Sequence, residues 1–102
     1  MNRTTRYGGL VLDPSDNVAT LLFDCSAGDT INLKGADSKV RAVESVESGH
    51  KIALSVIGKG SDIIKYGQRI GIATADIRPG EWVHLHNMES VYDTDFRKRV
   101  TL

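Results

Sequence analysis

The fold of this chain is best indicated by the stretch Ile77-Arg78-Pro79-Gly80-Glu81-Trp82-Val83, which joins a turn signal to the start of a strand. A glycine at this place can take a positive φ angle and close a tight turn. The β-branched Val83 that follows favours an extended backbone. We therefore predict a turn at Gly80 and a strand that continues to Asn87.

The same pattern occurs elsewhere in the chain. An apolar residue stands three positions before a glycine, a polar residue directly after it, and an apolar residue three positions beyond it. The copies are Cys25/Gly28/Asp29/Ile31, Val46/Gly49/His50/Ile52, Ile57/Gly60/Ser61/Ile63 and Ile77/Gly80/Glu81/Val83. Glycines are frequent here, with 10 in 102 residues, so short patterns also recur by chance. We favour the interpretation that the fold consists of repeated turn-into-strand units.

Short apolar runs predict the other strands, at residues 9–12, 18–23, 31–33, 40–43, 51–57, 63–66 and 68–74. The runs at 31–33 and 40–43 flank a polar loop and are expected to form a hairpin. No window keeps a 3.6-residue apolar period over the length of a typical helix. The prediction is a compact, mostly-β domain of about seven short strands with little helix.

Composition restricts the classes of protein that fit. Thirteen basic residues balance 13 acidic ones, so no strong field would gather nucleic acid. No apolar run is long enough for a membrane span or a secretion signal, and we expect a cytoplasmic protein without a membrane partner. The single cysteine, Cys25, agrees with a reducing compartment and is predicted to be a buried structural thiol.

The expected domain organisation is simple. Residues 1–8 form a flexible N-terminal arm, residues 9–88 form one β domain, and residues 89–102 form a tail or the start of a linker. In the last segment Tyr92, Phe96 and Val100 are spaced by four. This spacing fits a short amphipathic helix against a partner, and a solvated tail is the alternative.

Two of the three histidines, His84 and His86, lie in the strand predicted to end at Asn87. Alternation along a strand would point both imidazoles to one face, with Cα atoms about 6 to 7 Å apart. That arrangement suits a metal ion, but a complete site needs three or four ligands. His50 is the only other histidine, and no carboxylate stands at a suitable spacing. The alternatives are a site shared with another subunit and two solvent-facing side chains.

Three short segments next to turn glycines carry polar groups that folding does not require: residues 48–51, 64–67 and 84–87. If the turns gather at one end of the domain, these segments would line one cleft. Such a cleft would suit an anionic, oxygen-rich ligand, with lysines as counter-ions and histidines as bases or metal ligands. Lysines are also ordinary surface residues on strand edges. The candidate residues are His50, Lys51, Lys65, Tyr66, His84, His86 and Asn87.

Several ordered motifs together resemble the small N-terminal domain of the altronate and galactarate dehydratases. They are Asp16-Asn17-Val18-Ala19, Gly49-His50-Lys51-Ile52-Ala53-Leu54, Ile64-Lys65-Tyr66-Gly67 with Ile70-Gly71, Ala75-Asp76-Ile77, and the stretch from Gly80 to Asn87. The resemblance extends from about residue 10 to residue 88. It implies an SAF-type domain with a β-clip fold, and it extends to the small subunit of sulfolactate sulfo-lyase.

The resemblance implies a component of a lyase that performs β-elimination on a hydroxylated carboxylic acid. The reaction would be dehydration of a sugar acid such as altronate or galactarate, or desulfonation of sulfolactate. We expect the chain to be inactive without a large catalytic part, present as a separate subunit or as the rest of a longer chain. By resemblance, the catalytic residues are His50, His84 and His86, and the substrate-binding residues are Lys51, Lys65, Tyr66 and Asn87.

The resemblance also bears on cofactors and partners. It implies a divalent metal such as iron or manganese in the complete enzyme, with His84 and His86 as ligands in a site shared with a partner. A homo-oligomer is compatible with this role. The alternative from a different class is a non-enzymatic SAF-type module that recognises a sugar acid or positions a partner protein.

Overall fold

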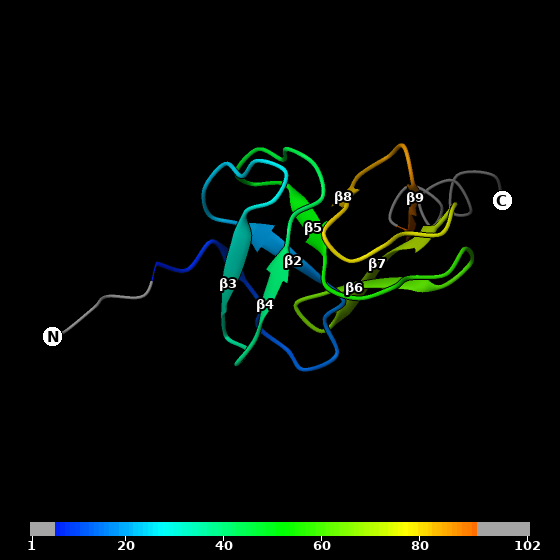
Figure 1. The fold of residues 1–102 in the computed structure, drawn as a ribbon. Helices are drawn as coiled ribbons and strands as arrows, with labels where there is room; N and C mark the ends of the chain where they lie inside the picture. The colour runs from blue at the N-terminus through cyan, green and yellow to red at the C-terminus, as the bar shows by residue number, and fades with distance from the viewer. Residues whose placement is uncertain (1–5, 92–102) are drawn as a thin grey trace, which may run out of the picture.

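The computed structural model describes residues 6–91, and strands are the regular elements of residues 6–90 (Figure 1). They are β1 (Gly9–Leu10), β2 (Val18–Leu21), β3 (Thr30–Lys34), β4 (Lys39–Arg41), β5 (Lys51–Ala53), β6 (Asp62–Lys65), β7 (Gln68–Ala73), β8 (Trp82–Val83) and β9 (Met88–Ser90). The prediction of a mostly-β domain of short strands is confirmed, with nine strands in this part of the chain instead of seven. The expected helix or tail at Tyr92, Phe96 and Val100 lies outside the described residues.

The strands form two sheets. One has six strands in the order β4-β3-β1-β2-β5-β8, and the other has three in the order β6-β7-β9. In Figure 1, β3 and β4 lie at one end, β6, β7 and β9 at the other, and β2 and β5 between them. The predicted hairpin is confirmed, since β3 and β4 pair antiparallel with Ile31 opposite Val40. Within the described residues, no helix has the length and apolar character needed to cross a membrane.

The repeated turn pattern is confirmed at all four places. The φ angles are +94° at Gly28, +84° at Gly49, +87° at Gly60 and +86° at Gly80. The apolar residues that begin the patterns pair with one another as isolated antiparallel bridges, Cys25 with Val46 and Ile57 with Ile77. We name the four turn units after these first residues: unit 25, unit 46, unit 57 and unit 77.

Unit 25 and unit 46 interlock through reciprocal backbone hydrogen bonds. The N–H of Gly28 donates to the carbonyl of Ala42, and the N–H of Gly49 donates to the carbonyl of Leu21, both at 2.8 Å. Ala42 and Leu21 each stand four residues before the unit opposite. Because the N–H of each turn glycine is satisfied by the segment that leads into the opposite unit, the two turns stabilise each other.

Unit 57 and unit 77 repeat this arrangement. Gly60 donates to Ala73 and Gly80 donates to Ala53, again at 2.8 Å. The chain therefore contains two equivalent halves. The first half, residues 25–53, runs through unit 25, the β3–β4 hairpin, unit 46 and β5. The second half, residues 57–83, runs through unit 57, the β6–β7 hairpin, unit 77 and β8.

Each half has its own apolar core, and β2 with β5 separates the two. Ala19 of β2 and Ile52 of β5 belong to the first core, whereas Val18 and Ala53 belong to the second. Alternation along a strand explains this division, because neighbouring residues point to opposite faces. Cys25 lies in the first core with 6% of its surface exposed, which confirms the predicted buried thiol. Burial raises the pKa of this thiol above its ordinary value.

The predicted strand to Asn87 is wrong, because β8 ends at Val83 and residues 84–87 form a turn. The side chain of Asn87 holds this turn. Its Oδ1 accepts from the N–H of His84 at 3.0 Å, and its Nδ2 donates to the carbonyl of Trp82 at 2.9 Å. An asparagine side chain that bonds the nearby backbone competes with strand pairing. The predicted alternation of His84 and His86 on one strand face is therefore also wrong.

Candidate functional site

The three histidines gather around the ring of Trp82. His84 stacks on it, with ring centroids 5.3 Å apart and planes 8° from parallel. The centroid of His86 lies 4.8 Å from that of Trp82, and the centroid of His50 lies 5.5 Å away in an edge contact. The structure therefore brings the histidines together through the 84–87 turn and the indole ring. We call these four residues the histidine–tryptophan cluster.

The protonation of this cluster favours a neutral imidazole at His84. Burial is the first cause that lowers the pKa of His84, and the charges of Lys51, His50 and His86 lower it further. The Nε1–H of Trp82 donates to Nδ1 of His50 at 3.3 Å. In its neutral form His50 then carries its proton on Nε2. The cluster thus combines an imidazole that can accept a proton near neutral pH with one whose Nε2–H can donate a hydrogen bond.

A second set of polar residues lies around β2, β5 and the tip of the β6–β7 hairpin. Thr20 pairs directly with Lys51 across β2 and β5, so both side chains lie on the same face. The hydroxyl of Tyr66 donates to Oγ1 of Thr20 at 2.8 Å, and Nζ of Lys65 lies 5.1 Å from the centroid of the Tyr66 ring. We call Thr20, Lys51, Lys65 and Tyr66 the lysine group.

The charge of one lysine of this group acts on the other. Burial is the first cause that lowers the pKa of Lys51, and the charge of Lys65 is the second. Within residues 6–91 the ion pairs join Arg69 with Asp62 and Arg78 with Glu81, so no carboxylate of this region neutralises either lysine by an ion pair. Two ammonium groups near each other without an acidic partner favour an anionic ligand.

The structure sorts six of the seven predicted site residues into these two groups instead of one cleft. His50 lies in the bend directly before β5 and contacts the rings of Trp82 and His84, whereas Lys51 begins β5 and pairs with Thr20. The groups adjoin, since the charge of Lys51 contributes to the lowered pKa of His84. Asn87 belongs to neither group, because its amide holds the 84–87 turn and only 7% of its surface is exposed. The catalytic and substrate-binding roles of these residues stay predictions.

Sequence reasoning missed two features of the site. Trp82 was considered only as part of a strand, although its ring is the common contact of the histidines. Thr20 was not considered, although its hydroxyl binds that of Tyr66. A hydroxyl residue inside the otherwise apolar Val18–Leu21 run was the one signal that singled out Thr20.

The described residues contain no group of three or more histidine, cysteine, aspartate or glutamate side chains placed to hold a metal ion. His84 and His86 can offer imidazole nitrogens, which suit iron and other transition metals. A metal held there would take its remaining ligands from elsewhere. A metal site shared with a partner stays a prediction.

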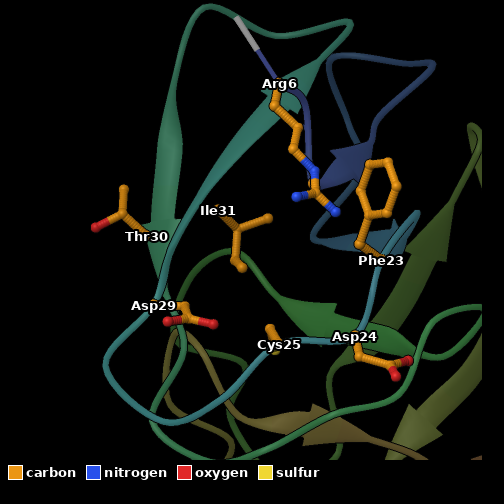
Figure 2. Close-up of a pocket in the computed structure, with 8 residues that line it drawn as sticks. Arg6, Phe23, Asp24, Cys25, Asp29, Thr30 and Ile31 are labelled. Carbon is orange, nitrogen blue, oxygen red and sulfur yellow. The ribbon is translucent and has the colours of Figure 1, made fainter.

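A separate hollow lies in the first half of the molecule and contains none of the predicted site residues (Figure 2). Its volume is about 220 Å³, and Arg6 lies over the ring of Phe23 at its edge, 3.7 Å from guanidinium carbon to ring centroid. The carboxylates that line it serve the turns. Asp24 accepts from the N–H of Ser48 and Asp29 from the N–H of Ser26, both at 2.8 Å.

Fold and site together define a small β module of two interlocked halves, with a histidine–tryptophan cluster next to a pair of lysines. Residues 7–91 match the family model of the altronate/galactarate dehydratase SAF domain, and the chain belongs to this family. The match includes both polar groups and all four turn units.

Relatives of two kinds are similar to the chain. Altronate dehydratase of Escherichia coli K12 is 44% identical over 72 residues, which cover 71% of this chain and 14% of the dehydratase. Galactarate dehydratase (L-threo-forming) of the same organism is 35% identical over 69 residues, 68% of this chain and 13% of that enzyme. The alpha subunit of (2R)-sulfolactate sulfo-lyase from Paracoccus pantotrophus is 34% identical over 60 residues, 59% of this chain and 90% of the subunit. The chain thus spans about a seventh of the dehydratases and the length of a small lyase subunit.

Proposed function

We propose that this chain is the SAF component of a lyase that catalyses β-elimination on a hydroxylated carboxylate, together with a larger catalytic part. The observation that carries this proposal is the histidine–tryptophan cluster beside Lys51 and Lys65. The relatives support it, because one is a subunit of a sulfo-lyase and others are dehydratases much longer than this chain. The substrate is a sugar acid such as altronate or galactarate, or sulfolactate.

The reaction needs a base, a stabiliser of negative charge and an acid. A neutral imidazole at His84 takes the proton from the carbon next to the carboxylate, and the electrons of that C–H bond form the new C=C bond. Lys51 and Lys65 stabilise the negative charge that develops on the carboxylate. The bond to the departing hydroxyl or sulfonate breaks at the neighbouring carbon, and the imidazolium that His84 has become can return its proton to a departing hydroxyl to release water.

A second arrangement within the proposal includes a divalent metal such as iron or manganese in the complete enzyme, and His84 is then a ligand while another group takes the proton. His84 and His86 would hold it with ligands from the larger part, and it would supply positive charge at oxygens of the substrate. In either arrangement Trp82 orients the imidazoles, because its ring contacts all three of them.

The proposal is tested with the full chain and its large catalytic component, added as a separate subunit or present in the same polypeptide. Turnover of altronate, galactarate and sulfolactate is measured for the natural sequence and for the triple variant His50→Ala, His84→Ala, His86→Ala. We expect turnover of one of these acids and a loss of at least about 100-fold in kcat in the triple variant. The control is Lys59→Ala, an exposed residue of unit 57, which should leave kcat unchanged.

Equal kcat values in the triple variant and the natural sequence would contradict the proposal. The second candidate function, a sugar-acid-binding module without catalysis, is favoured by the two lysines that lack an acidic partner within residues 6–91. Binding of galactarate by the chain, with no turnover in any combination, would establish that module.

A further inference from the structure

The tip of the β6–β7 hairpin contains a strained tyrosine. Lys65 pairs with Gln68, so Tyr66 and Gly67 form a two-residue loop, and their φ angles are +54° and +76°. Asparagine or glycine is favoured at the first position of such a loop, since a bulky side chain at positive φ costs about 1 kcal/mol or more. Among residues 6–91, Tyr66 is the only non-glycine residue with a positive φ. A requirement other than turn formation must therefore favour the tyrosine here.

The strained tip is fixed to β2 by the two residues before that strand. Oδ1 of Asp16 accepts from the N–H of Gly67 at 2.8 Å. The Asn17 side chain accepts from the N–H of Ile64 at 2.7 Å and donates to the carbonyl of Asp62 at 2.8 Å. Asn17 thus pairs with β6 as a neighbouring strand would, and the tip cannot turn away from β2 without losing these bonds.

The fixed tip places the Tyr66 hydroxyl on Thr20. Once Oγ1 of Thr20 accepts this hydrogen bond, its own hydroxyl hydrogen is available for another acceptor. Thr20 lies on the same strand face as Lys51, its partner across β2 and β5. A hydroxyl donor and two ammonium groups from three separate strands are thereby brought to one place.

We propose that the lysine group is a carboxylate-binding subsite in which Lys51 and Lys65 supply the positive charge. Thr20 holds the side chain of Tyr66 through their hydrogen bond, and it donates its own hydroxyl hydrogen to a carboxylate oxygen. The proposal deepens the proposed function, because it assigns the recognition of the substrate's carboxylate to this group and gives Thr20 a role there. The strained Tyr66 turn follows from it. A tyrosine is required at this position because asparagine and glycine, which favour the turn, are too short to reach Thr20.

The test is a titration of the full-length, ¹⁵N-labelled chain followed by NMR. The probes are D-galactarate, galactitol as its uncharged counterpart, and inorganic phosphate as an anion of different shape. We expect galactarate to bind and to shift the amide signals of Thr20, Lys51 and Tyr66. Equal or tighter binding of galactitol, or of phosphate, would overturn the assignment to a carboxylate.

Variants separate positioning from mere folding. Thr20→Val keeps the β-branched shape and removes the hydroxyl, and we expect the Kd for galactarate to rise about tenfold. Thr20→Ser should restore binding to within about twofold of the natural sequence, since serine keeps the hydroxyl. Thr30→Val, an exposed threonine of β3 in the first half, is the matched control and should leave Kd unchanged.

Tyr66→Phe removes the same hydrogen bond from its other end and leaves β2 intact. The double variant Thr20→Val, Tyr66→Phe should bind no more weakly than Thr20→Val alone, because Thr20→Val already removes the hydrogen bond that Tyr66→Phe removes. An unchanged Kd in Thr20→Val or additive losses in the double variant would overturn the proposal.

The complex with the large component distinguishes this inference from the proposed function. Thr20→Val should raise KM more than it lowers kcat, because it weakens carboxylate binding and leaves the histidines in place. Turnover with a KM that does not respond to Thr20→Val would refute the subsite alone. Galactarate binding that depends on Thr20, without turnover, would refute the lyase function alone.

Discussion

The two hairpin tips occupy the same place in the two halves of the molecule, but different contacts determine their conformations. Lys34 ends β3 and Lys65 ends β6. Lys34 is followed by Gly35, where a Cβ would lie 1.7 Å from the carbonyl oxygen of Val11, so the first tip is shaped by close packing. Lys65 is followed by Tyr66, which accepts an unfavourable φ to reach Thr20. The repeat therefore provides the fold, and the candidate site lies where the two halves differ.

The residues that follow the turn glycines also differ from unit to unit. Unit 25 and unit 57 are followed by small or acidic polar residues that begin hairpins. In unit 46 the turn glycine is followed by His50 and Lys51, and in unit 77 it is followed by Glu81 and Trp82. β5 and β8, the strands that these last two units begin, pair with each other, with Ile52 opposite Trp82. The candidate site therefore forms where the closing strands of the two halves meet.

The largest expected effect separates two turn glycines that the repeat makes equivalent. Gly49 and Gly80 have φ angles of +84° and +86°. A Cβ at Gly49 would meet nothing within 4 Å, whereas one at Gly80 would lie 2.0 Å from the carbonyl oxygen of Arg41. We expect Gly49→Ala to lower the free energy of unfolding by about 1–2 kcal/mol, from backbone strain alone. Gly80→Ala should cost about 3 kcal/mol or more, because the clash with the first half adds to the strain.

Urea denaturation of both variants measures this difference through the midpoint at constant m-value. Equal losses in the two variants would mean that the second half does not depend on close contact with the first at Gly80. The observed contact also includes a hydrogen bond from the N–H of Val43 to the carbonyl of Gly80 at 3.1 Å.

A smaller effect tests whether the two tip lysines differ electrostatically. Burial is the main cause of the lowered pKa of Lys51, and Lys65 adds to it. Lys65→Met should raise the pKa of Lys51 toward its ordinary value without restoring it, since burial remains. Lys34→Met removes the equivalent charge in the first half and should leave the pKa of Lys51 unchanged. An NMR titration of the lysine ¹³Cε signals measures both.

The pKa of Lys51 also determines the sign of its effect on stability. Its folded pKa lies below its unfolded pKa, so between these values the unfolded chain binds more protons. The free energy of unfolding therefore rises with pH across that window. Lys65→Met should bring the folded pKa of Lys51 closer to its unfolded pKa, and the free energy of unfolding should then rise less with pH. A pKa of Lys51 that responds equally to both substitutions would show that the tips act on the site alike.

The turns were predictable from the sequence because each needs a residue at positive φ, and a glycine at that position in the pattern indicates it. The end of β8 was not, because the bonds that stop it at Val83 come from the side chain of Asn87, which also fits the end of a strand. The gathering of the histidines was anticipated for the wrong reason. Stacking on Trp82 within a turn, and not alternation along a strand, brings His84 and His86 together.

The hydrogen bond of Thr20 could not be predicted, because its partner is a residue 46 positions away. The Asp16-Asn17 and Ile64-Lys65-Tyr66-Gly67 motifs were recognised separately. The structure connects them, since the first motif provides the hydrogen bonds that fix the second. Such pairing depends on strand register and loop position, which local patterns do not contain.

The smallest expected effect concerns the first residue of each unit. Cys25 occupies the position of Val46, Ile57 and Ile77, and it bridges to Val46 as Ile57 bridges to Ile77. If the repeat makes these positions equivalent, Cys25→Val should change the free energy of unfolding by less than about 1 kcal/mol. The hollow that Cys25 lines has room for the added methyl group. Val46→Cys is the reciprocal control, and urea denaturation compares the two. A loss of several kcal/mol in Cys25→Val alone would mean that the first half requires a thiol where the second requires only an apolar side chain, so the equivalence of the halves would not extend to their central bridges.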